Sequence, residues 1–269
     1  MIKKIFILCL LVVCAVLAED ISKHPKFHQT ANATTIVNPY RYAVVGGGPV
    51  AFQGVTTLTD NTGSGSTSIS VEAGTELLLL CETGYPPASS PTAHSYNGSS
   101  FTEIDLNTVE KPGGGGWVEN QQRFWYLQDP ATGSNTYTWS GGGTITHGGF
   151  LSLIRISGVD TTVGSSGIRG LLAQAQNGRT TITLAPGNAT DDLIVSCWNQ
   201  QVSTTVTLGN GQVFGGTSGT QTIVDSVGYN SDGVYVTTSV PTAASQDVSF
   251  LGATGSNYPS GLALSIASD

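Results

Sequence analysis

Residues 67–81 join an alternating segment, Thr67-Ser68-Ile69-Ser70-Val71, through a glycine turn, Glu72-Ala73-Gly74-Thr75, to an apolar run, Leu77-Leu78-Leu79-Leu80-Cys81. Alternation of polar and apolar residues is typical of a strand with one face in a core and the other in water. The leucine run is apolar at every position, which indicates a buried strand. This stretch therefore predicts β-strands that pack into a sheet structure rather than helices.

Further β-prone segments recur along the rest of the chain, separated by Gly, Asn, Asp and Pro. Asn97-Gly98 is a strong hairpin signal. The only helix candidate is Ile168–Ala175, one or two turns long, and no repeat of 20 to 50 residues is visible. We therefore expect an all-β fold, a two-sheet antiparallel sandwich of the jelly-roll kind. The strand candidates are Glu76–Cys81, Arg123–Leu127, Thr136–Trp139, Phe150–Ile156, Thr180–Leu184, Leu193–Trp198, Gly233–Val240 and Leu262–Ile266.

The composition agrees with this expectation. The 269 residues include 35 Gly, 28 Ser and 34 Thr, and only 10% are charged, against about 25% in an average soluble protein. A helical bundle or coiled coil needs more Glu and Lys. The glycines keep no three-residue period, which excludes collagen. The 39% of hydrophobic residues argue against global disorder. The length suits one large sandwich or two small ones.

The first 18 residues have the features of a secretory signal peptide. Lys3 and Lys4 precede a short apolar run, and Val16-Leu17-Ala18 suits cleavage before Glu19. The alternative is an uncleaved membrane anchor. We expect a secreted or cell-surface protein with a signal peptide (1–18), an extended N-terminal arm or linker (19–50) and one β-sandwich domain (51–269).

The mature chain is expected to be strongly acidic. Loss of the signal removes Lys3 and Lys4 and leaves 8 basic against 18 acidic residues, a net charge of −10. Such a surface repels nucleic-acid backbones and anionic membranes. We therefore expect neither nucleic acid nor, after signal cleavage, a membrane as a partner.

Cys81 and Cys197 are the two cysteines that follow the predicted signal peptide, and each ends an apolar run. In an oxidising compartment they could form a disulfide between distant strands. The alternative is a pair of buried free thiols. Neither the cysteines nor the four histidines have the spacing of a zinc site, and we expect no metal and no cofactor.

The segment before the sandwich is extended in character. Pro39 blocks a helix, and Gly46-Gly47-Gly48 ends the segment as a flexible joint. We expect this arm to complete a sheet of a neighbouring copy by β-augmentation; a disordered leader or a first edge strand of the same domain are the alternatives. The residues expected to make this contact are Ile36, Val37, Tyr40, Tyr42 and Val44.

The order of motifs is similar to a loose family of β-sandwich modules in secreted bacterial proteins and phage virion proteins. The resemblance spans about Ala51–Ile266 and implies a structural or binding module with no catalytic residues. It rests on Val71-Glu72-Ala73-Gly74, Tyr96-Asn97-Gly98, Trp125–Pro130, Thr138–Gly141, Ser157–Asp160 and Asp192–Val195, each of which is a weak motif by itself.

Aromatic residues suggest a second possibility, a glycan-binding adhesive module. Tyr85 and Trp117 lie near predicted loops, where exposed rings could stack on sugars. The alternative reading is that such rings fill the core, which is favoured for Trp125 and Trp139.

A third possibility is a jelly-roll glycanase, suggested by Glu103-Ile104-Asp105-Leu106-Asn107. Alternate residues of a strand share one face, so Glu103 and Asp105 could share a cleft. Asn107 stands where such enzymes need a carboxylic acid, and an ordinary strand face is the simpler interpretation. We therefore expect no enzyme but a non-catalytic extracellular structural subunit whose partner is itself, as an oligomer or filament, or else a surface glycan.

Overall fold

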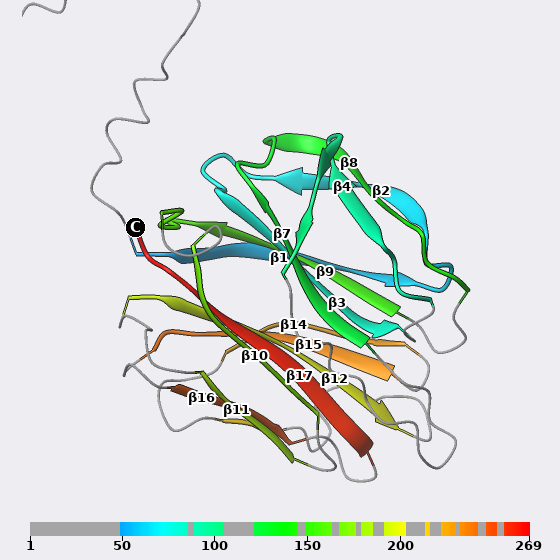
Figure 1. Cartoon of the computed structure of the whole chain (residues 1–269), viewed down its shortest axis with the longest axis vertical. Coiled ribbons are helices and arrows are strands. Elements are labelled where there is room, and N and C mark those ends of the chain that lie inside the picture. Colours follow the sequence, from blue (N-terminus) through cyan, green and yellow to red (C-terminus); the bar gives the residue numbers. More distant parts are fainter. Residues whose placement is uncertain are drawn as a thin grey trace, which may run out of the picture. The chain divides into compact units, whose positions relative to one another are not determined.

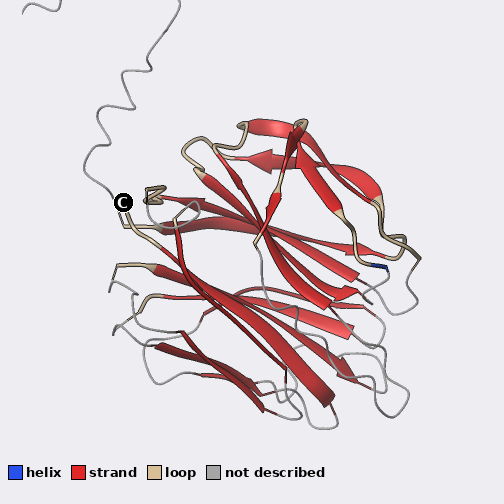
Figure 2. Cartoon of the chain, viewed as in Figure 1, coloured by secondary structure: helices blue, strands red, loops and turns tan. Residues whose placement is uncertain are grey.

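The computed structural model describes residues 49–85, 89–104, 121–144, 149–162, 167–175, 179–184, 191–202, 213–215, 222–229, 232–241, 246–251 and 256–269. Apart from a short helical turn at Ser89, the regular elements of these ranges are β-strands (Figure 2). Every pairing between the strands is antiparallel. The expectation of an all-β antiparallel sandwich is confirmed.

The first half of the described chain forms two sheets. Sheet 1 has the strand order β2-β8-β4-β5, and sheet 2 has the order β1-β9-β3-β7-β6. The strands are β1 (Ala51–Asp60), β2 (Gly65–Val71), β3 (Leu77–Tyr85), β4 (Ala93–Tyr96), β5 (Ser99–Ser100), β6 (Thr102–Glu103), β7 (Gln121–Gln128), β8 (Gly133–Ser140) and β9 (Gly149–Ser157).

The second half forms two more sheets. Sheet 3 has the order β10-β17-β12-β15-β14, and sheet 4 has the order β11-β16-β13. The strands are β10 (Ile168–Ala175), β11 (Arg179–Leu184), β12 (Leu193–Val202), β13 (Val213–Gly215), β14 (Thr222–Tyr229), β15 (Asp232–Ser239), β16 (Gln246–Leu251) and β17 (Ser256–Ile266).

The two halves share one topology. β5 and β6 are short strands separated only by Phe101; counted as one strand, they give each half eight strands. Sheets 2 and 3 then have the same order, since β1, β9, β3, β7 and β6 correspond to β10, β17, β12, β15 and β14. Sheets 1 and 4 correspond in the same way. When the strands of each half are numbered from one to eight, the outer sheet has the order 2-7-4 and the inner sheet the order 1-8-3-6. This is the strand order of a jelly roll.

The four sheets are stacked as layers in the order 1, 2, 3, 4 (Figure 1). Three apolar clusters fill the spaces between them. One cluster lies between sheets 1 and 2, one between sheets 2 and 3, and one between sheets 3 and 4. The described residues thus contain two jelly rolls in tandem, and the expectation of a single two-sheet sandwich is corrected to four sheets.

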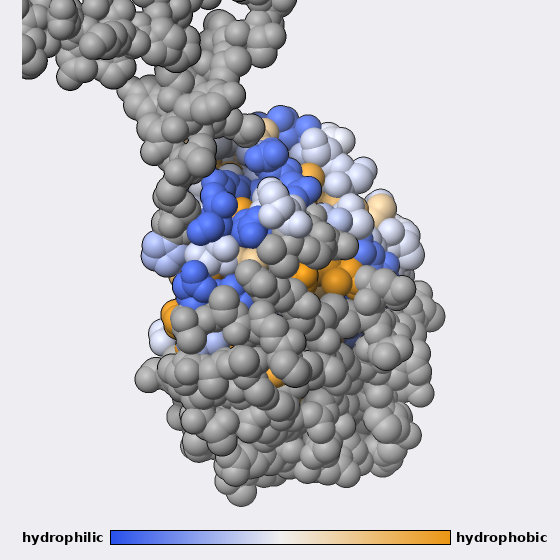
Figure 3. Space-filling model, turned by 60° about the vertical axis from the view of Figure 1, so that its left-hand side comes forward, coloured by the Kyte–Doolittle hydropathy of each residue, from blue (hydrophilic) through white to orange (hydrophobic). Residues whose placement is uncertain are grey.

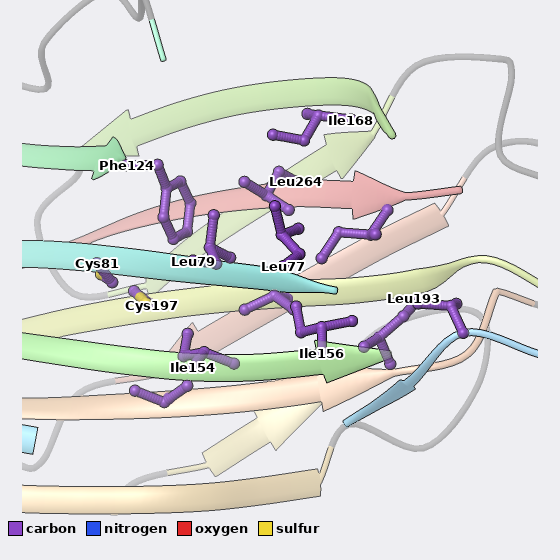
Figure 4. Packing of buried hydrophobic residues seen from close by; sticks show 14 of the residues in the cluster. Leu77, Leu79, Cys81, Phe124, Ile154, Ile156, Ile168, Leu193, Cys197 and Leu264 are labelled. Carbon is purple, nitrogen blue, oxygen red and sulfur yellow. The ribbon is translucent and has the colours of Figure 1, made fainter. Parts of the chain in front are cut away.

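The leucine run of β3 explains why sheet 2 is an inner layer. Leu77, Leu79 and Cys81 face sheet 3, whereas Leu78 and Leu80 face sheet 1. All nine residues of β3 are buried. Burying both faces of a strand requires apolar residues at every position, and the run supplies them without alternation. Figure 4 shows this packing between sheets 2 and 3.

Two glycines let large rings lie directly on an inner strand. A Cβ atom at Gly149 of β9 would come within 2.2 Å of the Tyr85 ring, and one at Gly261 of β17 within 2.2 Å of the Trp198 ring. Both rings are almost completely buried. Each jelly roll therefore seats an aromatic residue of its third strand on a glycine of its last strand.

The local turn predictions have mixed outcomes. Asn97 and Gly98 have positive φ values of 49° and 79° and join β4 to β5, so the predicted hairpin is confirmed.

Residues Ile168–Ala175 form strand β10 and not the expected short helix. Their Leu, Ala and Gln favour a helix locally, but pairing with β17 overrides this preference.

Candidate functional site

The most concentrated group of chemically active side chains lies between sheets 1 and 2. Glu82 comes from β3, His94 from β4, Trp125 from β7 and Tyr137 from β8. All four are buried, and Glu82 and Tyr137 have no exposed surface. We call these four residues the Glu82 network.

Period-two geometry explains how Glu82 reaches this position. Glu82 is in phase with Leu78 and Leu80, so its side chain leaves β3 on the face that looks at sheet 1. There the Nε2 atom of His94 lies 3.2 Å from Oε2 of Glu82, and Trp125 donates its Nε1–H to the same oxygen at 3.1 Å. A carboxyl group of an inner strand is thus bonded to both sheets of the first jelly roll.

The hydrogen bonds define the roles of the ring nitrogens. When Nε2–H of His94 donates to Glu82, Nδ1 of a neutral imidazole accepts from the Tyr137 hydroxyl, which lies 2.8 Å away. Aromatic rings enclose the imidazole: the Tyr137 ring is stacked at 6.1 Å and the Trp125 ring is edge-on at 4.8 Å. Oε1 of Glu82 is buried and has no hydrogen-bond partner among the described residues.

The groups of the network are hydrogen-bonded to one another, and the two sheets close them off from solvent. Glu82, His94 and Tyr137 show between 0% and 2% of their surface. In this arrangement they orient one another and join sheet 1 to sheet 2. The sequence indicates such a group, because the charged Glu82 lies two residues after Leu80 and therefore on the same buried strand face as Leu78 and Leu80.

A second polar contact fixes Tyr85. Its hydroxyl donates to Oδ2 of Asp60 at 3.1 Å, and the same carboxyl group accepts from the backbone N–H groups of Thr62 and Gly63. Tyr85 is fully buried against Gly149. Its ring face is not open to a sugar, so the interpretation of Tyr85 as a surface stacking residue is corrected.

Burial and neighbouring carboxyl groups keep two of these phenols neutral. Burial, followed by the charges of Asp60 and Glu82, raises the pKa of Tyr85 far above its usual range. The pKa of Tyr137 is raised by burial and then by Glu82 and Asp60. In the unfolded chain both phenols would ionise near a pKa of 10.

This difference predicts alkaline sensitivity. The free energy of unfolding should be unaffected by these tyrosines below about pH 10 and should fall above it by up to about 1.4 kcal/mol per pH unit for each tyrosine. The unfolded chain then releases protons that the folded chain keeps. Denaturant titrations between about pH 8 and 11 measure the slope. Tyr137→Phe should reduce the slope of the free energy of unfolding against pH by the contribution of one tyrosine. An identical slope in the variant would contradict the prediction.

The two cysteines meet between sheets 2 and 3. Cys81 of β3 and Cys197 of β12 are both fully buried free thiols, and their side chains point toward each other (Figure 4). Burial, and then the hydrogen bond with Cys197, raise the pKa of Cys81 above its usual range. The structure thus brings together the two cysteines that the sequence singled out as a possible pair.

The other predicted residues have varied positions. Trp125 and Trp139 are core residues, as favoured, and Trp139 stacks on Tyr137. Glu103 lies in β6 with its carboxyl 3.6 Å from Nε of Arg123, which fits an ordinary strand face. Outside the described residues lie the arm residues Ile36, Val37, Tyr40, Tyr42 and Val44, and also Asp105, Asn107 and Trp117.

The described surface is mostly polar. Figure 3 shows hydrophilic and neutral residues over much of the described part of one face, with hydrophobic residues in small areas. Ile223 and Val240 are the large hydrophobic residues recorded as exposed, at 47% and 55%. Within the described ranges no helix is long and apolar enough to cross a membrane. In the same ranges no three His, Cys, Asp or Glu side chains are grouped as metal ligands.

Fold and site together define an all-β protein of two tandem jelly rolls, the first of which contains a closed polar network. No family model, no curated protein and no solved structure matches the chain. The functional argument therefore rests on the chain's own residues.

Proposed function

We propose that the protein is a non-catalytic extracellular structural subunit, of surface, filament or virion type, that assembles with copies of itself through its N-terminal arm. The observation that carries the proposal is the tandem jelly roll with continuous apolar cores through four layers. Jelly rolls serve as building blocks of viral capsids as well as lectin domains. This support is architectural, because a fold by itself does not specify a function.

The placement of the polar groups supports the same proposal. Glu82, His94 and Tyr137 are hydrogen-bonded to one another inside the core and hold two sheets together. A subunit that must keep its shape in an assembly benefits from such internal connections. A hydrolase would instead need these groups at a surface that a substrate can reach.

An edge strand offers a site for an added strand. In the described residues β2 is an outer strand of sheet 1 and pairs only with β8. Its seven residues, Gly65–Val71, include no charged residue and no proline. Charges and prolines are the usual means of preventing edge-to-edge pairing, so the backbone of β2 is suited to accept another strand. The arm of a second copy is the proposed donor.

The test is the assembly state with and without the arm. Light scattering after size exclusion should find a discrete large oligomer or filament for the chain that carries residues 19–48. A chain lacking them should be a folded monomer with an unchanged circular dichroism spectrum. Normal assembly of the truncated chain, or a monomeric complete chain at every concentration tested, would refute the proposal.

Point variants make this test sharper. The double variant Tyr40→Asp and Tyr42→Asp should abolish assembly, because two charges would have to enter a sheet contact. The matched control adds the same two charges outside the contact run, as Asn32→Asp and Thr34→Asp, and should assemble normally. Loss of assembly in both variants would show a general charge effect, and normal assembly of both would contradict the arm contact. The glycan-binding alternative now depends on Trp117 alone and is not adopted.

A further inference from the structure

The cysteine pair occupies equivalent positions in the two jelly rolls. Cys81 and Cys197 are each the fifth residue of the third strand of their half. The pairing with the last strand repeats as well: Leu77↔Ile156 and Cys81↔Ser152 in the first half, Leu193↔Ile266 and Cys197↔Leu262 in the second. The duplicated fold therefore brings the same strand position of both halves to their common interface.

The two strands that carry the cysteines approach each other across the interface between sheets 2 and 3. Strands β3 and β12 belong to different sheets, yet Cα atoms of the two strands come within 8 Å of each other. Stacked sheets are typically about 10 Å apart. Cysteine side chains are small, point toward each other in Figure 4, and share a hydrogen bond. The immunoglobulin fold shows that a disulfide can bridge two packed sheets in such a core.

The surroundings favour a permanent bond over a reactive thiol. Leu79, Phe124, Val195 and Val236 are apolar members of the cluster that contains both cysteines. Both sulfurs are fully buried, so an oxidant must reach them before the halves close on each other. Once formed, a bond in this place is shielded from dissolved reductants.

We propose that Cys81 and Cys197 are oxidised during folding to a disulfide that joins the two jelly rolls covalently. A thiolate of one cysteine attacks a small-molecule or protein disulfide, forms a mixed disulfide, and the second cysteine displaces the carrier. The pair loses two S–H bonds and gains one S–S bond. The S–S bond of the oxidant breaks, and the two electrons and two protons lost by the cysteines convert the oxidant into two thiols. The proposal is independent of the assembly function.

Peptide mapping tests the bond directly. The full chain is refolded from denaturant with oxidised and reduced glutathione, alkylated, and digested without reduction. Mass spectrometry should find one linked peptide pair containing Cys81 and Cys197, and reduction should separate the pair. Alkylation of both cysteines after this treatment, or linkage of either one to Cys9 or Cys14, would overturn the proposal.

The second measurement compares the Tm of the oxidised protein with the Tm of the same protein in its reduced form. The bond would close a loop of about 115 residues, and oxidised protein should unfold about 10 °C higher than the same protein refolded with a thiol reductant. Cys81→Ala and Cys197→Ala should each abolish this oxidant-dependent difference, whatever the variant's own Tm. The control Cys14→Ser should retain it. An unchanged Tm difference in Cys81→Ala would overturn the assignment even if that variant is less stable.

Discussion

Replacing His94 with leucine is expected to lower the free energy of unfolding by about 3 kcal/mol, the upper end of the usual cost of leaving a buried polar group without its hydrogen-bond partner. The imidazole Nε2 is bonded to Glu82 at 3.2 Å, and the carboxyl group has no exposed surface from which water could replace it. Oε1 of Glu82 already lacks a partner among the described residues. Denaturant unfolding monitored by tryptophan fluorescence and circular dichroism would measure the loss.

The double variant Glu82→Leu with His94→Leu is the decisive companion. Removing both polar partners also removes the uncompensated carboxyl group, so this variant should be more stable than His94→Leu alone. Full recovery is not expected, because Trp125 and Tyr137 each lose a hydrogen bond. A double variant less stable than the single one would show that packing, and not the carboxyl group, accounts for the cost.

Replacing Trp198 with alanine should cost about 3–5 kcal/mol, the range for a large aromatic residue removed from a core. Trp198 has no exposed surface and lies directly on Gly261, which has no side chain to fill the space that the indole would leave. Its Nε1–H also donates to Oγ of Ser196 at 2.9 Å. Thermal and denaturant unfolding of the variant would measure the effect.

Two further substitutions separate the contributions at Trp198. Trp198→Phe keeps most of the ring volume but loses the bond to Ser196, and should cost clearly less than the alanine variant. Ile223→Ala removes a side chain that is 47% exposed and should change stability by no more than about 0.5 kcal/mol. An Ile223 effect as large as that of Trp198 would contradict the placement of the core between sheets 3 and 4.

Local features of the chain could be predicted because they depend on neighbouring residues. The leucine run becomes a strand buried on both faces, and Asn97-Gly98 forms the predicted hairpin turn. The prediction of a helix at Ile168–Ala175 was wrong because the local preference of this segment is weak, and seven of its residues pair with residues of β17 instead.

The candidate site was harder to predict from sequence. Glu82 could have been noticed, because a charged residue in phase with Leu78 and Leu80 must either find a polar partner or disrupt the core. Its partners His94 and Tyr137 come from strands of another sheet, and no local pattern connects them. Tyr85 was a candidate for sugar stacking because it lies near a predicted loop, whereas it is buried over Gly149.

The β character of the chain, many of the described strands and the burial of β3 could be predicted from the sequence, since each depends on residue types a few positions apart. The tertiary structure alone decided that there are four sheets in two equivalent jelly rolls, that Glu82 meets His94, and that Cys81 faces Cys197. The physical reason is that neighbours in these sheets are distant in the chain: β3 lies between β7 and β9, not beside β2 or β4. Which strands pair is set by the fit of whole apolar faces, a property of the assembled layers.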